Sequence, residues 1–251
     1  MGLPEHPLSP AGEQTSRFAA TDWSLVLAAG GTNADSVRPA MGRLLEAYWY
    51  PLYAFVRRKG RNPDDAADIT QEFLTRLIER NFLSLADPTK GKFRTFLLTA
   101  LERFLVDVRR RETREKRGGG RAVLSLSMLD AEDRYRLEPA DVEALTPEQI
   151  FERRWAITLL EQALKRLEQE SAAAGRGPLF AALRPVLAGE PTDGSYVEIA
   201  GALGMKEGAL KTAVHRLRRR FGAILRTEIA STVAGPAEIE EEVQQLFRSF
   251  G

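Results

Sequence analysis

The segment KTAVHRLRRRFG, residues 211–222, places a dense set of cations around apolar residues at helical spacing. Five Lys and Arg side chains and His215 lie among Leu217 and Phe221. A helix of this kind can bury its apolar stripe on a small core while its remaining faces contact an anion. Nucleic acid is the longest such anion in a cell, so this segment is a candidate for DNA binding.

A second set of residues that could take part in chemistry is acidic. Asp64, Asp65, Asp68 and Glu72 place carboxylates three and four residues apart, a spacing that can hold Mg²⁺ in a nuclease. Acids in the first turn of a helix also stabilise its positive end, which is the simpler explanation. No second carboxylate cluster lies beside a basic groove. We therefore expect no enzyme: no catalytic residue, no metal and no other cofactor.

The cysteine and histidine content narrows the possible classes of enzyme and metal site further. The chain contains no cysteine and two histidines, His6 in a Pro-rich leader and His215 in the basic helix. Thiolate chemistry is excluded, and a zinc site or a Ser-His-Asp enzyme is hard to build. No apolar run approaches the ~20 residues that cross a bilayer, and the N-terminus lacks the features of a signal peptide. We expect a cytoplasmic protein without membrane insertion.

The net charge of +1 conceals an uneven distribution. Residues 92–121 and 206–226 form two basic blocks, whereas residues 130–152 and the tail are rich in acids. Two cationic blocks separated by an anionic one suggest two contacts on a polyanion. The alternative is that these blocks are solvated helix faces.

The chain of 251 residues is long enough for two domains, and no segment shows the alternation of a strand. We predict an all-α chain with two small helical domains joined by a flexible linker. Pro51 is expected to kink or split a long helix that starts near Asp35. The predicted segments are a disordered leader (1–17), a helical domain (18–117), a linker (118–146), a second helical domain (147–235) and an acidic amphipathic tail (236–251).

Residues 195–230 are typical of a helix-turn-helix, with Gly204 at the turn and Lys206 opening the second helix. In this motif the N-terminal part of the second helix meets base edges in the major groove, and later cations meet phosphates. The candidate base readers are Lys206, Glu207, Lys211, Thr212, His215 and Arg216. Arg218, Arg219 and Arg220 are the candidate phosphate contacts. A packed helical hairpin with a solvated basic face is the alternative.

Three segments carry a resemblance to a known family. NPDDAADITQEFLTRLIE, KGKFRTFLLTALERFLVDVRRR and SYVEIAGALGMKEGALKTAVHRLRRRF follow one another in the chain. In this order and spacing the chain resembles the extracytoplasmic-function (ECF, group IV) sigma factors of bacterial RNA polymerase, over residues 18 to about 232. Such factors consist of sigma regions two and four. A branch of the group also carries features similar to Arg117–Gly120, Arg134–Pro139 and the tail Pro236–Phe250.

The resemblance implies three interfaces. The acidic helix would bind the clamp helices of the largest polymerase subunit through Asp65, Asp68, Gln71, Glu72 and Phe73. The minus-ten promoter element would be opened and held by Lys92, Phe93, Arg94, Phe96, Arg103, Arg109 and Arg110. Region four would read the minus-thirty-five element as duplex, with the flap of the second-largest subunit and an anti-sigma factor or other regulator as further partners. Core packing is the alternative for the phenylalanines, and it is favoured for Phe96.

The chain departs from the motifs of this group at one place, and both its function and its tail have alternative interpretations. Many members of the group have Ala-Arg-Asn where this chain has Leu101-Glu102-Arg103, so the base contact of that Asn is not carried over. A conventional repressor or activator that binds duplex operators is the alternative function. The tail is expected either to fold back on region four, or dock on the polymerase or a regulator, or simply to stabilise the end of the chain.

Overall fold

The computed structural model describes residues 34–79, 83, 86–87, 92–114, 128–136, 144–188, 196–230, 233 and 236–250, together with 26, 29 and 31. In this part of the chain the regular elements are helices and no strand occurs, which confirms the all-α prediction. The helices are α2 (Ala34–Arg58), α3 (Pro63–Glu79), α4 (Phe93–Arg114), α5 (Met128–Arg136), α6 (Pro147–Ala173), α7 (Gly177–Ala188), α8 (Tyr196–Ala202), α9 (Glu207–Ala230) and α10 (Pro236–Arg248). The predicted leader, 1–17, and the Arg117–Gly120 segment lie outside the described residues.

Helix α3 begins where its sequence predicts. Asn62 Oδ1 accepts a hydrogen bond of 2.8 Å from the Asp65 amide, Pro63 is the first helical residue, and acids occupy the first turn. The buried face of α3 packs on α4, where the Phe73 and Phe104 rings lie 5.7 Å apart. Helix α2 continues through Pro51 without splitting, so that alternative is wrong.

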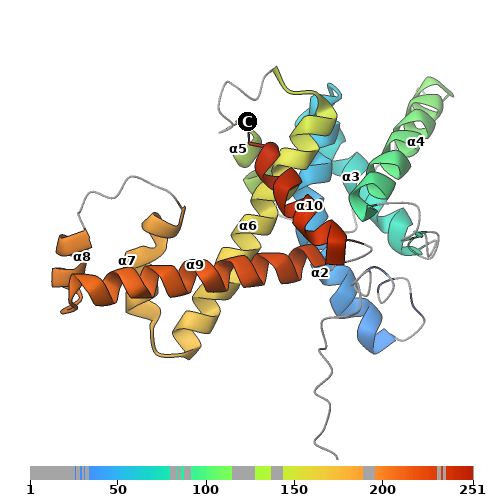
Figure 1. Cartoon of the computed structure of the whole chain (residues 1–251). Coiled ribbons are helices and arrows are strands. Elements are labelled where there is room, and N and C mark those ends of the chain that lie inside the picture. The colour runs from blue at the N-terminus through green and yellow to red at the C-terminus, as the bar shows by residue number, and fades with distance from the viewer. Residues whose placement is uncertain are drawn as a thin grey trace, which may run out of the picture.

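Helix α6 begins at a complete capping box. The Gln149 amide donates to Thr146 Oγ1 at 3.2 Å, and the Thr146 amide donates to Gln149 Oε1 at 2.9 Å. The helix then runs for 27 residues, packs on α2 and is crossed by α9 (Figure 1). Its length lets one helix contact α2 as well as α7 and α9.

The hydrophobic core is shared between the segments predicted as two domains. One cluster contains Tyr48 and Phe55 of α2, Trp155 and Leu159 of α6, and Ile224 of α9. A smaller cluster joins Leu183 of α7 to Ala200 of α8 and Val214 of α9. The two predicted domains are therefore packed together in this structure, and their boundaries stay a prediction.

The predicted linker holds helix α5, which lies on α2. Ala131 is buried, and Glu132 accepts hydrogen bonds from Arg57 and from the Tyr53 hydroxyl. Burial alone would raise the pKa of Glu132, but these hydrogen bonds outweigh burial and hold the pKa below its usual range. Burial and the same carboxylate raise the pKa of Tyr53. Residues 118–127 and 137–143 of the predicted linker lie outside the described residues.

The tail forms α10, which packs against α9 and α6 (Figure 1). Val243 and Leu246 are buried, and Ile239 is partly buried against the same core. At the edge of this contact, Arg226 of α9 pairs with Glu240 at 3.4 Å. The apolar stripe thus lies against the core and contributes to holding the tail in place.

Candidate nucleic-acid interface

Helices α8 and α9 are joined by a tight turn. Gly204 has a φ of 62°, the Gly204 amide donates to the Gly201 carbonyl at 3.1 Å, and the Met205 amide donates to the Ala200 carbonyl at 2.8 Å. These two bonds form a Schellman motif, which requires a left-handed residue and favours glycine. The turn sets the angle at which α9 leaves α8, and the small cluster with Leu183 fixes both helices to α7.

The cationic face of α9 points to solvent. The structure exposes the following candidate residues of α9 and the residue before it: Lys206, Glu207, Lys211, Thr212, His215, Arg216, Arg218 and Arg219. Leu210 and Val214 on the opposite side are buried. The helix therefore presents an exposed basic surface about four turns long, while its other side is fixed by packing.

Some of these side chains already have partners within the chain. Lys211 pairs with Glu207 at 2.6 Å, and the hydrogen bond to that carboxylate raises the pKa of Lys211. Arg218 donates a long hydrogen bond of 3.4 Å to the Val186 carbonyl. Arg219 has no hydrogen bond or ion pair with any residue that the structure describes. Of the candidate phosphate contacts Arg218, Arg219 and Arg220, Arg219 is thus the one whose side chain has no partner among the described residues.

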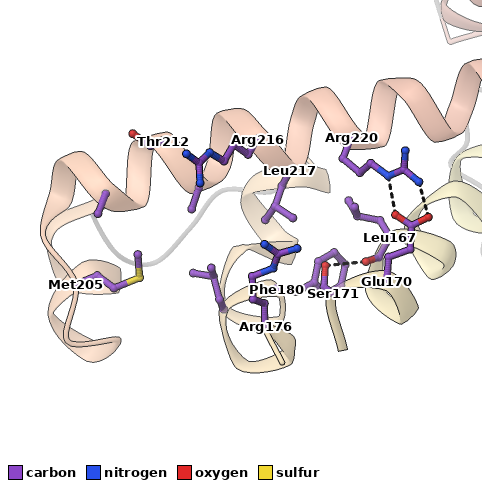
Figure 2. A pocket seen from close by; sticks show the side chains of 13 residues that line it. Leu167, Glu170, Ser171, Arg176, Phe180, Met205, Thr212, Arg216, Leu217 and Arg220 are labelled. Atoms are coloured by element: carbon purple, nitrogen blue, oxygen red, sulfur yellow. Dashed lines mark hydrogen bonds and ion pairs between the residues drawn. The ribbon is translucent and has the colours of Figure 1, made fainter. Parts of the chain in front are cut away.

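Arg220, predicted as a phosphate contact, instead turns toward α6. Its Nε and Nη2 donate to the two carboxylate oxygens of Glu170 at 2.6 and 2.7 Å. These bonds hold the pKa of Glu170 below its usual range. Figure 2 shows this bidentate pair at one end of a pocket.

The pocket lies between α6, α7 and α9 and has a volume of about 620 Å³. Its lining includes buried Leu167 and Phe180 and the exposed Arg176 and Arg216 (Figure 2). Apolar lining residues beside exposed cations fit an apolar side chain of a protein partner whose surroundings are acidic. Sequence periodicity gave no signal for this pocket, because its walls come from three separate helices.

The candidate minus-ten residues separate into two groups. Arg103, Arg109 and Arg110 are exposed along α4. Phe93 and Arg94 are buried, and Lys92 and Phe96 are half-buried. The Phe93 ring meets Tyr48 edge-on at 5.4 Å and stacks on Phe96 at 6.0 Å. The two phenylalanines thus take part in core packing here.

Arg94 is the centre of a buried charged cluster. Arg94 Nε donates to Glu152 of α6 at 2.8 Å, Arg94 Nη1 donates to Glu242 of α10, and Lys92 Nζ lies 3.2 Å from Glu242. The Arg94 guanidinium also lies over the Trp155 ring, 4.6 Å from its centroid. We call Lys92, Arg94, Glu152, Trp155 and Glu242 the Arg94 cluster. Burial, together with the neighbouring Arg94 cation, lowers the pKa of Lys92.

Sequence reasoning missed three members of the Arg94 cluster: Glu152, Trp155 and Glu242. Glu242 lies in a row of tail acids, and its side chain is only 1% exposed. The one signal in the sequence is that Glu242 precedes Val243 in the apolar stripe, which does not distinguish it from Glu240 or Glu241.

The candidate polymerase-binding residues on α3 also differ in exposure. Asp65 and Asp68 are exposed, whereas Gln71 and Phe73 are buried. Glu72 is half-buried and accepts hydrogen bonds from Arg76 at 2.6 Å and from Arg111 of α4 at 2.9 Å. Of these five candidates, Asp65 and Asp68 are thus the ones exposed to a partner.

The acids of α3 do not come together as a metal site. Across the residues that the structure describes, no three His, Cys, Asp or Glu side chains are grouped so that they could hold a metal ion. A search of the same residues for a helix long and apolar enough to span a bilayer finds none.

Comparison with known proteins gives one match. Residues 44–115 match the family model of sigma-70 region 2. This segment comprises most of α2 and all of α3 and α4, which carry the exposed acids and arginines described above. No curated protein and no solved structure matches the chain.

Proposed function

We propose, from the premise that residues 44–115 match sigma-70 region 2, that this protein is a sigma factor of the ECF group. The match itself supports membership in the sigma-70 family and a role in transcription initiation with core RNA polymerase and promoter DNA. It is the observation that carries the proposal. A factor of this kind binds and positions other molecules in the bacterial cytoplasm and leaves the chemistry of RNA synthesis to the polymerase.

The proposed polymerase contacts are two. Exposed Asp65 and Asp68 on α3 are suited to a basic partner surface, and we assign them to the clamp helices of the largest subunit. The pocket of Figure 2 is suited to an apolar side chain, and we assign it to the flap of the second-largest subunit. Each contact is small, so binding through both at once would give the affinity.

The proposed minus-ten surface is the exposed side of α4 with the residues at its N-terminal end. Arg103 and Arg110 are seven residues apart and thus lie on nearly the same side of the helix. Opening one base-pair step forfeits about 1.4 kcal/mol of stacking. Cations and aromatic surfaces that neutralise and stack on the exposed strand return a few kcal/mol. A row of arginines is therefore suited to holding melted DNA.

The proposed minus-thirty-five reader is α9, as the second helix of a DNA-binding helix-turn-helix. Support comes from the tight turn at Gly204, the packed side of α9 and its exposed cations. Docking such a helix in the major groove would bring Lys206 and Lys211 toward base edges and Arg219 toward a phosphate.

Run-off transcription with purified core polymerase and a genomic template library tests the proposal. We expect discrete start sites that need both the polymerase and this chain. The proposal fails if the chain does not bind core polymerase, or if the same start sites are used without it. Tight, sequence-specific binding to duplex DNA by the chain alone would favour a conventional repressor or activator.

A further inference from the structure

We infer that the C-terminal helix α10 holds the free chain in a closed state in which its Glu242 carboxylate occupies two of the proposed minus-ten contacts, Lys92 and Arg94. The closed state is defined by contact of Glu242 with both cations. The inference rests on the proposed function, because Lys92 and Arg94 matter for promoter binding only if the chain is a sigma factor.

The geometry leaves Arg94 little accessible surface for DNA. The guanidinium uses Nε for Glu152 and Nη1 for Glu242, and one of its faces is covered by Trp155. A phosphate oxygen would need the same donors, since carboxylate and phosphate both bind the arginine fork. With its side chain 5% exposed, Arg94 also offers no surface on which a base could stack. DNA and α10 therefore compete for one side chain.

The buried position of Glu242 makes this contact specific. A carboxylate that is almost fully buried must be paired, because an isolated buried charge is strongly unfavourable. Lys92 and Arg94 are the two cations within ion-pair distance of it in the described structure. Buried Val243 and Leu246 fix the helix after this position along the chain, and partly buried Ile239 packs on the same core before it. The apolar stripe thus provides the attachment, and Glu242 directs it to the minus-ten surface.

The closed state sets the fraction of chain that can bind a promoter. When only an open fraction is competent, the apparent affinity falls by that fraction. If the closed state held about nine-tenths of the chain, full release would raise the apparent affinity about tenfold. A polyanion such as promoter DNA, or a partner that takes the apolar side of α10, would favour release.

Glu242→Gln tests the inference, because it removes the charge and keeps the size of the side chain. Glu241→Gln is the matched control, since the neighbouring Glu241 has the same chemistry but is exposed. The chain has no cysteine, so spin labels can be placed on single cysteines at exposed Val106 of α4 and Gln244 of α10. Electron–electron double resonance then measures the distance between α4 and α10 without polymerase.

We expect one narrow distance for the unaltered chain and for Glu241→Gln, and a broader, longer distribution for Glu242→Gln. With core polymerase, Glu242→Gln should bind a minus-ten promoter fragment more tightly than the unaltered chain does. The expected fold-increase in affinity is one divided by the open fraction measured for the unaltered chain. A narrow distance in Glu242→Gln overturns the inference. Release of α10 in Glu242→Gln without a change in promoter affinity also overturns the inference. Neither outcome affects the proposed function.

A second variant covers the case in which Glu242→Gln fails to fold. Cysteines in place of Arg226 and Glu240, which form an exposed pair between α9 and α10, can be joined by a short bis-maleimide. The joined chain should lose promoter affinity relative to each single-cysteine chain treated with the same reagent. Full affinity in the joined chain overturns the inference. If no chain, unaltered or variant, initiates with core polymerase, the proposed function fails instead, whatever the measured distances.

Discussion

The Glu132 carboxylate accepts two hydrogen bonds from Arg57, 3.0 Å from Nε and 3.1 Å from Nη2, and a third of 2.6 Å from the Tyr53 hydroxyl. Both side chains of the ion pair are less than one-fifth exposed. This contact joins a helix of the predicted linker to α2. It adds to the apolar contacts that Ala131 and Tyr135 of α5 make with the core.

Glu132→Gln should lower the free energy of unfolding by about 2 kcal/mol, because it weakens charged hydrogen bonds that are shielded from water. Urea unfolding followed by circular dichroism measures the change. Asp133→Asn is the control, since Asp133 is exposed and its replacement should change stability by less than about 0.5 kcal/mol. Equal effects of the two variants would show that the contact adds nothing.

The same contact predicts a pH dependence. The pKa of Glu132 in the folded chain lies below the ordinary value of 4.5, so its contribution is complete above that value. The contribution is lost as the pH falls through the lower, folded pKa. The stability difference between the unaltered chain and Glu132→Gln should therefore shrink toward zero in acid. Urea titrations at neutral and acidic pH measure it, and a constant difference would contradict the assignment.

Arg219 and Arg220 should behave differently although they are neighbours. Arg219→Ala should lower the salt slope of minus-thirty-five binding by about 0.9, as expected for one lost phosphate contact on duplex DNA. Arg220→Ala should leave this slope unchanged, because Arg220 is bound to Glu170. Fluorescence anisotropy with holoenzyme at several salt concentrations measures both slopes. An equal loss in both variants would mean that the pair with Glu170 opens on DNA.

Asp68→Asn should weaken binding to core polymerase by about fivefold, close to 1 kcal/mol, because it removes an exposed charge from the proposed clamp-helix contact. Its stability should not change. Glu161→Gln, an exposed acid on α6, is the control and should bind normally. Titration of labelled chain with core polymerase measures the affinities, and normal binding by Asp68→Asn would remove this residue from the interface.

Gly204→Ala should cost about 1 kcal/mol of stability, because alanine disfavours the left-handed backbone at a φ of 62°. No atom lies within 4 Å of the added Cβ, so the cost is conformational. Gly201→Ala, inside α8 and equally unobstructed, should be neutral or stabilising by up to about 1 kcal/mol. Thermal unfolding of both variants distinguishes backbone strain from packing.

Features encoded by neighbouring residues were predictable from sequence. Asn62 with Pro63, and Thr146 with Gln149, mark the starts of α3 and α6 because caps are formed within four residues. The exposed face of α9 follows equally from its spacing of cations and apolar residues. Pro51 shows the limit of such rules, since packing of α2 on α6 maintains a helix that proline disfavours.

Contacts between distant residues were not predictable. Arg94 and Glu242 are 148 residues apart, and nothing in the tail marks Glu242 as the acid that becomes buried. Glu132 likewise lies in a segment whose composition predicts a flexible linker, yet one arginine on α2 gives it a partner. Pairing of this kind depends on the whole arrangement of helices, so one sequence gives the charges but not their partners.

Helix α6 connects α2 to α7 and α9 as a single continuous rod about 40 Å long. Its first turn contacts Ala54 of α2 through Ile150, and its last turns pair with α9 through Arg166 and Glu170. Adding one residue between these anchors would rotate one set by about 100° against the other. An insertion or deletion between these anchors therefore keeps both contacts only if its length is close to a whole number of helical turns. This part of α6 should tolerate substitution far better than insertion or deletion.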